Sequence, residues 1–425
     1  MAYVFPVIAV CIPLMIKFGS RIDNYFSISD FGQFYLVSKA VITGDHLYSP
    51  ATWRHTYMSV LGIPFHQSDP FGARYEYYSP SAGFLILPIS FFSYRGAEWA
   101  WFFISIIVLE WGLWQLINTL KPDLSLLKKT IIVIVIMCSS SMRWPLLQQQ
   151  MSPLIFGILA LFISSSIKQN GLASMIYGSM ILWLKPTFWL PVLGLSIISF
   201  RPKLIVWMIL IWIIINSIGF YRMGGTAAFH GYIYNISHAE VRGQGDYPDP
   251  YLSTSSLLIN GTFLFRSIFS NINTAHHVAD LLCFMVIVLI GWECIRGKKV
   301  ISEPQKILLF TGPLIGLTLF SVYHQFYDAN LLLLPLMIYY LSLDNILKLR
   351  WVQLYSIVVV WYCILYMKGI DHRLLFMIKA DQSLLIIERL QGSIITFIAL
   401  ITSYLAVHVF INQKLAARRD INSAI

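Results

Sequence analysis

The sequence predicts an all-α polytopic membrane protein with a single domain over residues 1–425. Apolar residues make up 57% of the chain and charged residues 12%, against roughly 45–50% and 25% in soluble globular domains. Mean hydropathy is +0.68. Apolar runs of about 16–22 residues recur from end to end, and roughly 20 helical residues cross the hydrocarbon core of a bilayer. This pattern excludes a single water-soluble core, and we expect a transmembrane bundle of about 11–13 helices.

The apolar runs give the candidate spans in chain order. They are residues 3–18, 97–118, 130–145, 153–167, 171–184, 187–200, 204–220, 278–295, 305–322, 328–347, 352–368 and 392–411. The first run has neither a basic segment before it nor a small-residue cleavage site, so we expect a retained helix and not a removed signal peptide. Several of these runs are short, so eleven or thirteen crossings are both possible. The run 79–93, of about 15 residues, is typical of a re-entrant or interfacial helix, and counting it as a span would invert every later loop.

Clusters of Lys and Arg between the apolar runs predict the orientation. These clusters are Lys121/Lys128/Lys129, Arg201/Lys203, Arg296/Lys298/Lys299, Lys348/Arg350 and Lys414/Arg418/Arg419. They fall at alternate helix ends, which places them in the cytoplasm of a multi-pass plasma-membrane protein. Residues 19–96 and 221–277 then form the first and second large outer loops, with juxtamembrane helices in the first, although Lys17, Arg21 and Arg54 oppose this bias. The net charge of +10 is therefore topological, and no nucleic-acid partner is expected.

The expected outer loops hold most of the Asp, His and Tyr residues, so we expect the chemistry on that face. Asp30 follows the first helix and has aromatic neighbours in the sequence. A carboxylate in such a place can act as a general base, which contributes about 10²–10⁴ in rate. The alternative is that Asp30 caps the helix that follows it, since Asp is a favoured N-cap residue.

Three side chains at expected outer helix ends can contact a phosphate. Lys185 supplies a point charge, Arg143 a bidentate fork and His324 a hydrogen-bond donor. Each has a structural alternative, because Lys185 can extend to the lipid headgroups, Arg143 can anchor a helix end and His324 can simply be hydrated. His230 and His238 in the second loop lack further ligands at metal-binding spacing, so no metal site is expected.

Several short motifs together resemble one enzyme family. The first loop contains Asp30-x4-Tyr35, Gly44-x3-Tyr48 and Tyr78-x-Pro80. Three later motifs are Gln150-Met151-Ser152, Leu184-Lys185-Pro186 and the segment Tyr323-His324-Gln325-Phe326-Tyr327-Asp328. Over roughly residues 25–345 this order resembles the polyprenyl-phosphate-sugar-dependent glycosyltransferases of family 87, in the GT-C superfamily. Gln149 stands where the family pattern has Gly, and Ser152 where it has Asn.

The resemblance implies a GT-C-like helix bundle with helical outer loops and an inverting glycosyltransferase. Asp30 would be the catalytic base, and Lys185, His324 and Arg143 would bind the donor phosphate. The implied substrate contacts are Tyr35, Tyr48, Tyr78, Gln150, Tyr327 and Asp328. The partners would be a polyprenyl-phosphate-linked sugar donor, a glycan or glycolipid acceptor and membrane lipids. No cofactor is expected, because a lipid phosphate is already a competent leaving group.

Two other functions stay open at this point. A glycan polymerase or ligase that uses a pyrophosphate-linked lipid would depend on loop arginines and histidines in place of an aspartate after the first helix. A secondary transporter would have paired halves, broken helices and ionisable residues near the middle of the membrane. Glu110 and Glu293 are the main acidic residues within the predicted spans.

Overall fold

The computed structural model describes residues 12–19, 31–61, 78–199, 201–237, 260–321, 326–342, 349–365 and 382–424, and within these ranges it is helical with no strand. The all-α prediction is thus confirmed.

The first part of the bundle contains α2 (Phe31–Thr43), α3 (Pro50–Leu61), α4 (Pro80–Ser90), α5 (Tyr94–Leu120), α6 (Leu126–Cys138), α7 (Ser140–Leu147), α8 (Ser152–Ile167) and α9 (Gly171–Leu184). It continues with η1 (Pro186–Phe188), α10 (Trp189–Ile198), α11 (Pro202–Arg222) and α12 (Thr226–Ser237). The second part contains α14 (Gly261–Arg266), α15 (Ile272–Gly297), α16 (Glu303–Ser321), η3 (Phe326–Leu332), α17 (Leu333–Ser342), α18 (Arg350–Val359), the π-helix η4 (Val360–Leu365) and α20 (Gln382–Ala424). Residues 12–19, within or next to the predicted first span, are also helical.

Four described helices are long and apolar enough to cross a membrane: α5, α11, α15 and residues 390–420 of α20. A fifth span results if α6 and α7 are counted together, but these two helices are bent by 61°. Five further apolar segments have 10–17 residues, and a 14-residue helix is only about 21 Å long. The expectation of 11 to 13 spans therefore counted short apolar helices that do not cross a bilayer alone, since its hydrocarbon core is about 30 Å thick. The chain is nevertheless a multi-pass membrane protein.

The predicted span 130–145 is wrong as a single helix. It is interrupted at Ser139, whose backbone is extended with φ −58° and ψ 146°. The Ser139 hydroxyl donates to the carbonyl of Ile136 at 2.7 Å, which satisfies part of the broken end of α6. Pro145 then lies inside α7. The sequence pattern indicated an uninterrupted apolar run because it records hydropathy and not the path of the backbone.

Helix α8 forms the centre of the bundle. Every residue from Ser152 to Ser166 is buried, as expected for a helix that is apolar on all sides. It lies directly against α5: a Cβ atom on Gly112 would be 2.1 Å from the Gly157 carbonyl oxygen, and one on Gly157 would be 2.5 Å from that of Val108. Small residues permit this close approach of two backbones. The contact fixes the position of Ser152, the first residue of α8.

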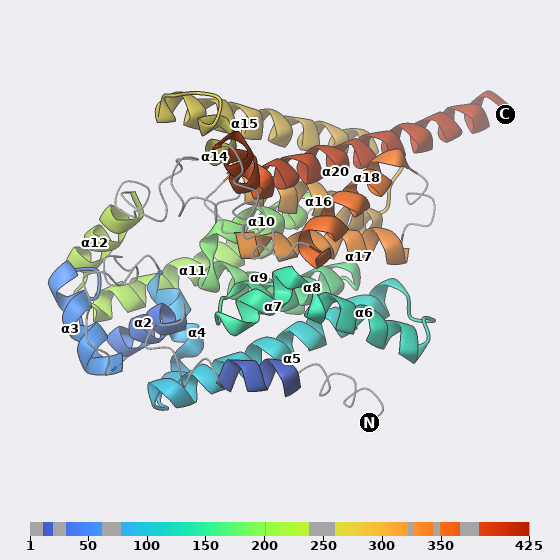
Figure 1. The fold of residues 1–425 in the computed structure, drawn as a ribbon. Helices are drawn as coiled ribbons and strands as arrows, with labels where there is room; N and C mark the ends of the chain where they lie inside the picture. Colours follow the sequence, from blue (N-terminus) through green and yellow to red (C-terminus); the bar gives the residue numbers. More distant parts are fainter. Residues whose placement is uncertain are drawn as a thin grey trace.

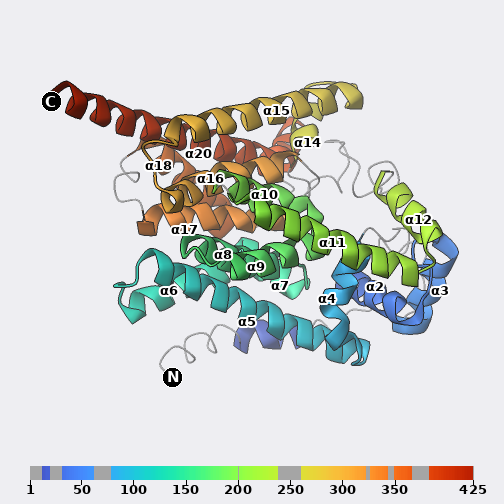
Figure 2. The ribbon, with the colours of Figure 1, turned by 180° about the vertical axis from the view of Figure 1, so that it is seen from behind.

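The two long polar segments of the chain meet at one end of the bundle. Figure 1 shows α2, α3 and α12 together at this end, and Figure 2 shows the same grouping from behind. The Arg222 guanidinium donates to the Ile42 carbonyl at 2.9 Å, and the Asn235 amide donates to the Tyr48 carbonyl at 3.4 Å. The α5–α6 turn, the α15–α16 turn and the C-terminus lie at the opposite end. That arrangement agrees with the predicted grouping of polar loops, while their placement outside the cell stays a prediction.

The short helix expected within residues 79–93 is α4, which is packed against protein on several sides. A Cβ atom on Gly83 would be 2.9 Å from the Val37 side chain of α2, and one on Gly219 of α11 would be 2.2 Å from Pro80. Helix α4 thus holds the first-loop helix α2 against the transmembrane helix α11.

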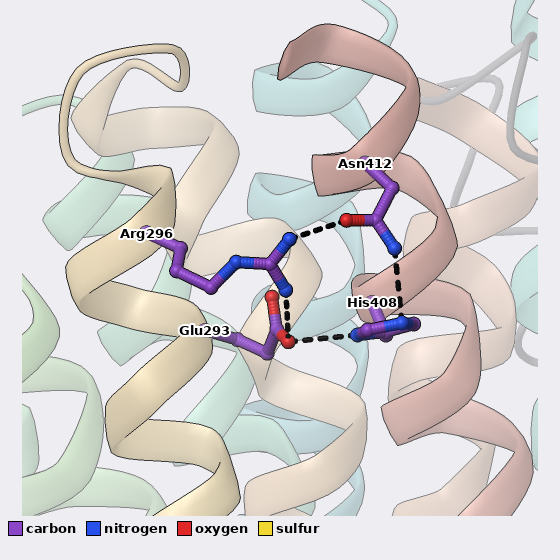
Figure 3. Close-up of polar contacts among 4 residues, drawn as sticks. All are labelled: Glu293, Arg296, His408 and Asn412. Carbon is purple, nitrogen blue, oxygen red and sulfur yellow. Dashed lines mark hydrogen bonds and ion pairs between the residues drawn. The ribbon is translucent and has the colours of Figure 1, made fainter. Parts of the chain in front are cut away.

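A polar network around the buried Glu293 joins α15 to α20 at the end opposite to α2 and α3 (Figure 3). Glu293 is 1% exposed, and its Oε1 atom lies 2.8 Å from Arg296 Nη1 and 2.7 Å from His408 Nδ1. The other Arg296 terminal nitrogen donates to the Asn412 carbonyl oxygen, so the Asn412 amide nitrogen faces His408 Nε2 at 2.9 Å. A hydrogen on Nδ1 and none on Nε2 of His408 satisfies this ring of contacts.

Replacing Glu293 by Gln should lower the stability of the fold. Gln preserves size but removes the negative charge that Arg296 and His408 both contact, and charged hydrogen bonds contribute about 1.5–3 kcal/mol each. Because the Arg296 side chain is 25% exposed, we expect a net loss of about 1–3 kcal/mol. The measurement is the melting temperature of the purified protein in detergent. Asp123→Asn, an exposed site, is the control and should change stability by less than about 0.5 kcal/mol. Equal melting of Glu293→Gln and the parent would contradict the expected contribution.

Candidate functional site

A buried carboxylate brings three distant sequence segments together. The Asp328 side chain is fully buried, and its Oδ2 atom lies 2.6 Å from the Lys185 ammonium. The Ser152 hydroxyl donates to its other oxygen, Oδ1, at 2.5 Å. Each of the three residues belongs to a different motif of the sequence analysis. The structure therefore joins the Gln-Met-Ser, Leu-Lys-Pro and Tyr-to-Asp motifs at one point.

Local sequence places Lys185 at a helix end. Helix α9 finishes at Leu184, and the Lys185 N–H donates to the Ile181 carbonyl at 3.0 Å. Proline disfavours the helical conformation in the residue before it, and Lys185 is extended with φ −149° and ψ 90°. Its ammonium lies 5.2 Å from the centre of the Phe188 ring, within the range of cation–π attraction. The extended backbone at Lys185 thus ends α9, and the Lys185 side chain contacts Asp328.

The turn before Ser152 has an uncommon backbone conformation. Gln149 has φ 56°, in the left-handed region that glycine adopts most readily. Its carbonyl accepts a hydrogen bond from the Trp101 indole at 3.3 Å, and its side-chain amide donates to the Glu98 carbonyl at 3.1 Å. Glycine, the residue of the family pattern at this position, adopts such a conformation without steric strain. In this chain α5 holds a glutamine there through two hydrogen bonds.

Two helices of the first loop, α2 and α4, also contact the residues around Gln149 and Lys185. Phe31, the first residue of α2, stacks on Trp101 with ring centres 5.3 Å apart. The Ser81 hydroxyl in the first turn of α4 donates to the Trp183 carbonyl, two residues before Lys185, at 3.1 Å. The starts of α2 and α4 therefore lie beside the Gln149 turn and the end of α9. Asp30 precedes Phe31 in the sequence but lies outside the described residues.

A second layer supports η3 behind Asp328. The Cys363 thiol donates to the Ala329 carbonyl at 3.3 Å, and the Ser140 hydroxyl donates to the Cys363 carbonyl at 3.0 Å. Cys363 lies in the π-helix η4, a rare form that is frequent at functional sites. Nothing in the sequence distinguishes Trp101, Ser140 and Cys363 from ordinary residues of an apolar run. In the sequence, only the departure of Gln149 from the family pattern could have drawn attention to this region.

Two of the predicted tyrosines support the first loop. The Tyr35 hydroxyl donates to the Phe92 carbonyl at 2.8 Å, and that of Tyr48 donates to the Tyr78 carbonyl at 2.8 Å. Burial raises the pKa of Tyr35 above the ordinary value of 10.0, which further favours the protonated hydroxyl that this bond needs. These contacts show a structural role for Tyr35 and Tyr48. Substrate binding by either one, or by the partly exposed Tyr78, stays a prediction.

The remaining predicted residues are less fully placed. Arg143 is exposed on α7, and its neighbour Met142 accepts a contact from Asn330 of η3 at 3.7 Å, so Arg143 lies on a helix that adjoins the Asp328 segment. Gln150 is buried in the turn before α8. His324 and the side chain of Tyr327 lie outside the described residues.

The two charged side chains of the centre, Lys185 and Asp328, differ in their exposure to solvent. Asp328 is sealed inside the protein, whereas the Lys185 side chain is 17% exposed. The ammonium donates one of its three N–H groups to the Asp328 carboxylate. A solute can therefore reach the lysine but not the aspartate. Such a centre is suited to binding a phosphate and unsuited to proton removal by Asp328.

Comparison with known proteins identifies the family. A model of glycosyltransferase family 87 matches residues 77–302, more than half of the chain. The chain belongs to glycosyltransferase family 87. A search of the curated proteins gave no significant match. Membership makes this chain a glycosyltransferase and disfavours the transporter alternative. The family-87 match contains Arg143, Ser152 and Lys185, whereas Asp30 and Asp328 lie beyond its limits.

Substitutions at Gln149 should reveal the cost of its backbone conformation. Gln149→Gly relieves a left-handed strain of about 1–2 kcal/mol but loses one hydrogen bond of about 1 kcal/mol, so its stability should stay near that of the parent. Gln149→Ala keeps the strain and loses the bond, so it should be about 1–2 kcal/mol less stable than Gln149→Gly. Thermal unfolding in detergent measures the difference.

The neighbouring Gln148 provides the matched control. Its φ of −85° is ordinary, so Ala should be at least as stable as Gly there. The same preference for Ala at Gln149 would show that the strain is absent.

Proposed function

We propose that this glycosyltransferase takes one sugar from a polyprenyl-phosphate carrier at the outer face of the plasma membrane and transfers it, with inversion, to a hydroxyl of a glycan or glycolipid. The observation that carries the proposal is the Lys185–Asp328–Ser152 centre, in which a sealed carboxylate holds a partly exposed ammonium at the end of α9. This centre adjoins the starts of α2 and α4, next to the grouped polar loops.

In the proposed reaction the acceptor oxygen attacks the anomeric carbon from the face opposite to the phosphate. The bond between that carbon and the phosphate oxygen breaks, and its electron pair stays on the leaving polyprenyl phosphate. Lys185 stabilises the negative charge that develops there, with Arg143 and His324 as further candidates. Asp30 removes the acceptor proton, so atoms and charges balance without a metal or other cofactor.

The geometry supports a positioning role for Asp328 in place of the direct substrate contact that the resemblance implied. A flexible lysine side chain loses conformational freedom when it binds a phosphate, and a fixed partner reduces that loss beforehand. Ser152 in turn fixes the carboxylate. The amide nitrogen of an asparagine can donate to a carboxylate as the Ser152 hydroxyl does, so the family's Asn at this position fits the same role.

Lys185 variants test the donor site. Lys185→Ala should raise the KM for the lipid-linked donor and lower kcat/KM by about 10²–10³, the usual effect of losing one preorganised electrostatic contact. Lys185→Arg should be partly active because it keeps the charge but changes the shape. Initial rates with radiolabelled polyprenyl-phosphate sugar in detergent provide the measurement.

A double variant separates catalysis from folding. Lys185→Ala leaves Asp328 as an uncompensated buried charge, which by itself destabilises the protein. The combination Lys185→Ala with Asp328→Asn removes both charges and should recover thermal stability without recovering activity. Lys168→Ala, at an exposed site near the opposite end of α8, should behave like the parent in both assays. Parental turnover by Lys185→Ala would refute its role at the phosphate.

Asp30→Asn tests the proposed base. Asn retains the shape and capping ability of Asp but cannot accept the proton, so we expect normal folding, donor affinity within a few-fold and a loss of about 10²–10⁴ in turnover. Asp45→Asn is the control from the same loop, because the Asp45 carboxylate accepts a hydrogen bond from Thr43 at 2.7 Å and should matter little for turnover. Full transfer activity of purified Asp30→Asn would exclude this mechanism, and loss of folding would favour the capping role.

A further inference from the structure

Helix α12 directly follows α11, a helix that is long and apolar enough to cross a membrane. Helix α11 has 21 residues, which is about 31 Å and matches the thickness of the hydrocarbon core. Only three residues join it to α12, and two of them, Gly224 and Gly225, have φ values of 112° and 66°. These left-handed conformations turn the chain away from the line of α11, as Figures 1 and 2 show. Since α11 ends at the surface of the bilayer, α12 cannot lie far from that surface.

One face of α12 is fixed to protein. Ala228, Tyr232 and Asn235 are buried, and they share a face because they are three or four residues apart. The Tyr232 ring lies 5.3 Å from that of Tyr48, and the Asn235 amide donates to the Tyr48 carbonyl. This face therefore holds the first-loop segment after α2 and orients the rest of the helix.

The adjacent face is apolar and exposed. Phe229, Ile233 and Ile236 follow one another at helical spacing and are 45%, 46% and 45% exposed. His230 and Tyr234, also exposed, form the next strip around the helix. The sequence Thr226–Ser237 contains no Lys, Arg, Asp or Glu. A helix that faced water on this side would be expected to carry charges there.

Helix α11, which precedes α12, also has a large exposed apolar side. That side includes Ile213, Ile214 and Ile218, which are 47–48% exposed. Helix α11 is long and apolar enough to cross a membrane, and only 17% of its apolar window is buried inside the protein, so these isoleucines are suited to contact with lipid. An amphipathic helix at the same boundary, with apolar residues on one strip and His and Tyr on the next, matches the pattern of an interfacial helix.

We propose that α12 lies in the membrane interface and inserts Phe229, Ile233 and Ile236 among the acyl chains of the adjacent leaflet, with His230 and Tyr234 at the level of the headgroups. Through Tyr48 the same helix holds the first loop against the lipid surface. The occupant of the apolar face is thus the bilayer itself. This inference is independent of the proposed reaction.

Photo-crosslinking tests the inference in the full chain. p-Benzoylphenylalanine is placed at Phe229 or at Ile233, and the folded protein is reconstituted into liposomes of phosphatidylethanolamine and phosphatidylglycerol. After irradiation, mass spectrometry of the intact protein identifies lipid adducts. Ala227 is the matched control site, because it is exposed on the same helix but lies roughly 120–180° from the apolar strip. We expect several-fold more lipid adduct at Phe229 and Ile233 than at Ala227.

Each other outcome overturns the inference. Equal, low adduct yields at all three sites would show that the strip faces water. Crosslinks to a second copy of the chain at Phe229 and Ile233 would show that protein covers it. The two sites are tested separately, and only variants that melt like the parent are scored, so misfolding at one position cannot produce the result.

Discussion

The fold of the candidate site depends on the burial of one carboxylate. Asp328 is removed from water completely, and an isolated buried carboxylate costs several kcal/mol unless charged or hydrogen-bonding groups replace the water. Lys185 and Ser152 are such groups, and they come from the end of α9 and the start of α8. Because Asp328 is stable in the interior only with both contacts, it fixes the relative positions of η3, the end of α9 and the start of α8. The close α5–α8 contact and the Gln149 turn then determine where one of those partners stands.

Composition, the length of apolar runs and helix-end residues predicted those parts of the fold that depend on neighbouring residues in the chain. Composition and long apolar runs indicated the membrane bundle, and the run 171–184 coincides with α9 because Asn170 caps its start and Lys185-Pro186 ends it. The short α4 followed from length alone. Motif order identified glycosyltransferase family 87, which the family match over residues 77–302 confirms.

The remaining features depend on contacts between distant residues. Nothing near Ser152 in the sequence indicates that its hydroxyl pairs with a carboxylate 176 residues later. The break at Ser139 is not visible as a change in hydropathy, and short buried helices have the same composition as spans. Gln149 departs from the Gly of the family pattern, yet its backbone has the left-handed conformation that glycine adopts most readily. The sequence motifs singled out Lys185 and Asp328 separately, and only the structure shows the ion pair between them.

The direct contact of Gly112 with Gly157 has a mechanical consequence. Where side chains separate two helices, rotamer changes absorb small displacements, but here backbone meets backbone and no rotamer is available. Helices α5 and α8 must therefore tilt as one rigid pair when the bilayer becomes thicker or thinner. Since Ser152 begins α8, such a tilt would move its hydroxyl relative to Asp328. The thickness of the host membrane would thus change the geometry of the Lys185–Asp328–Ser152 centre.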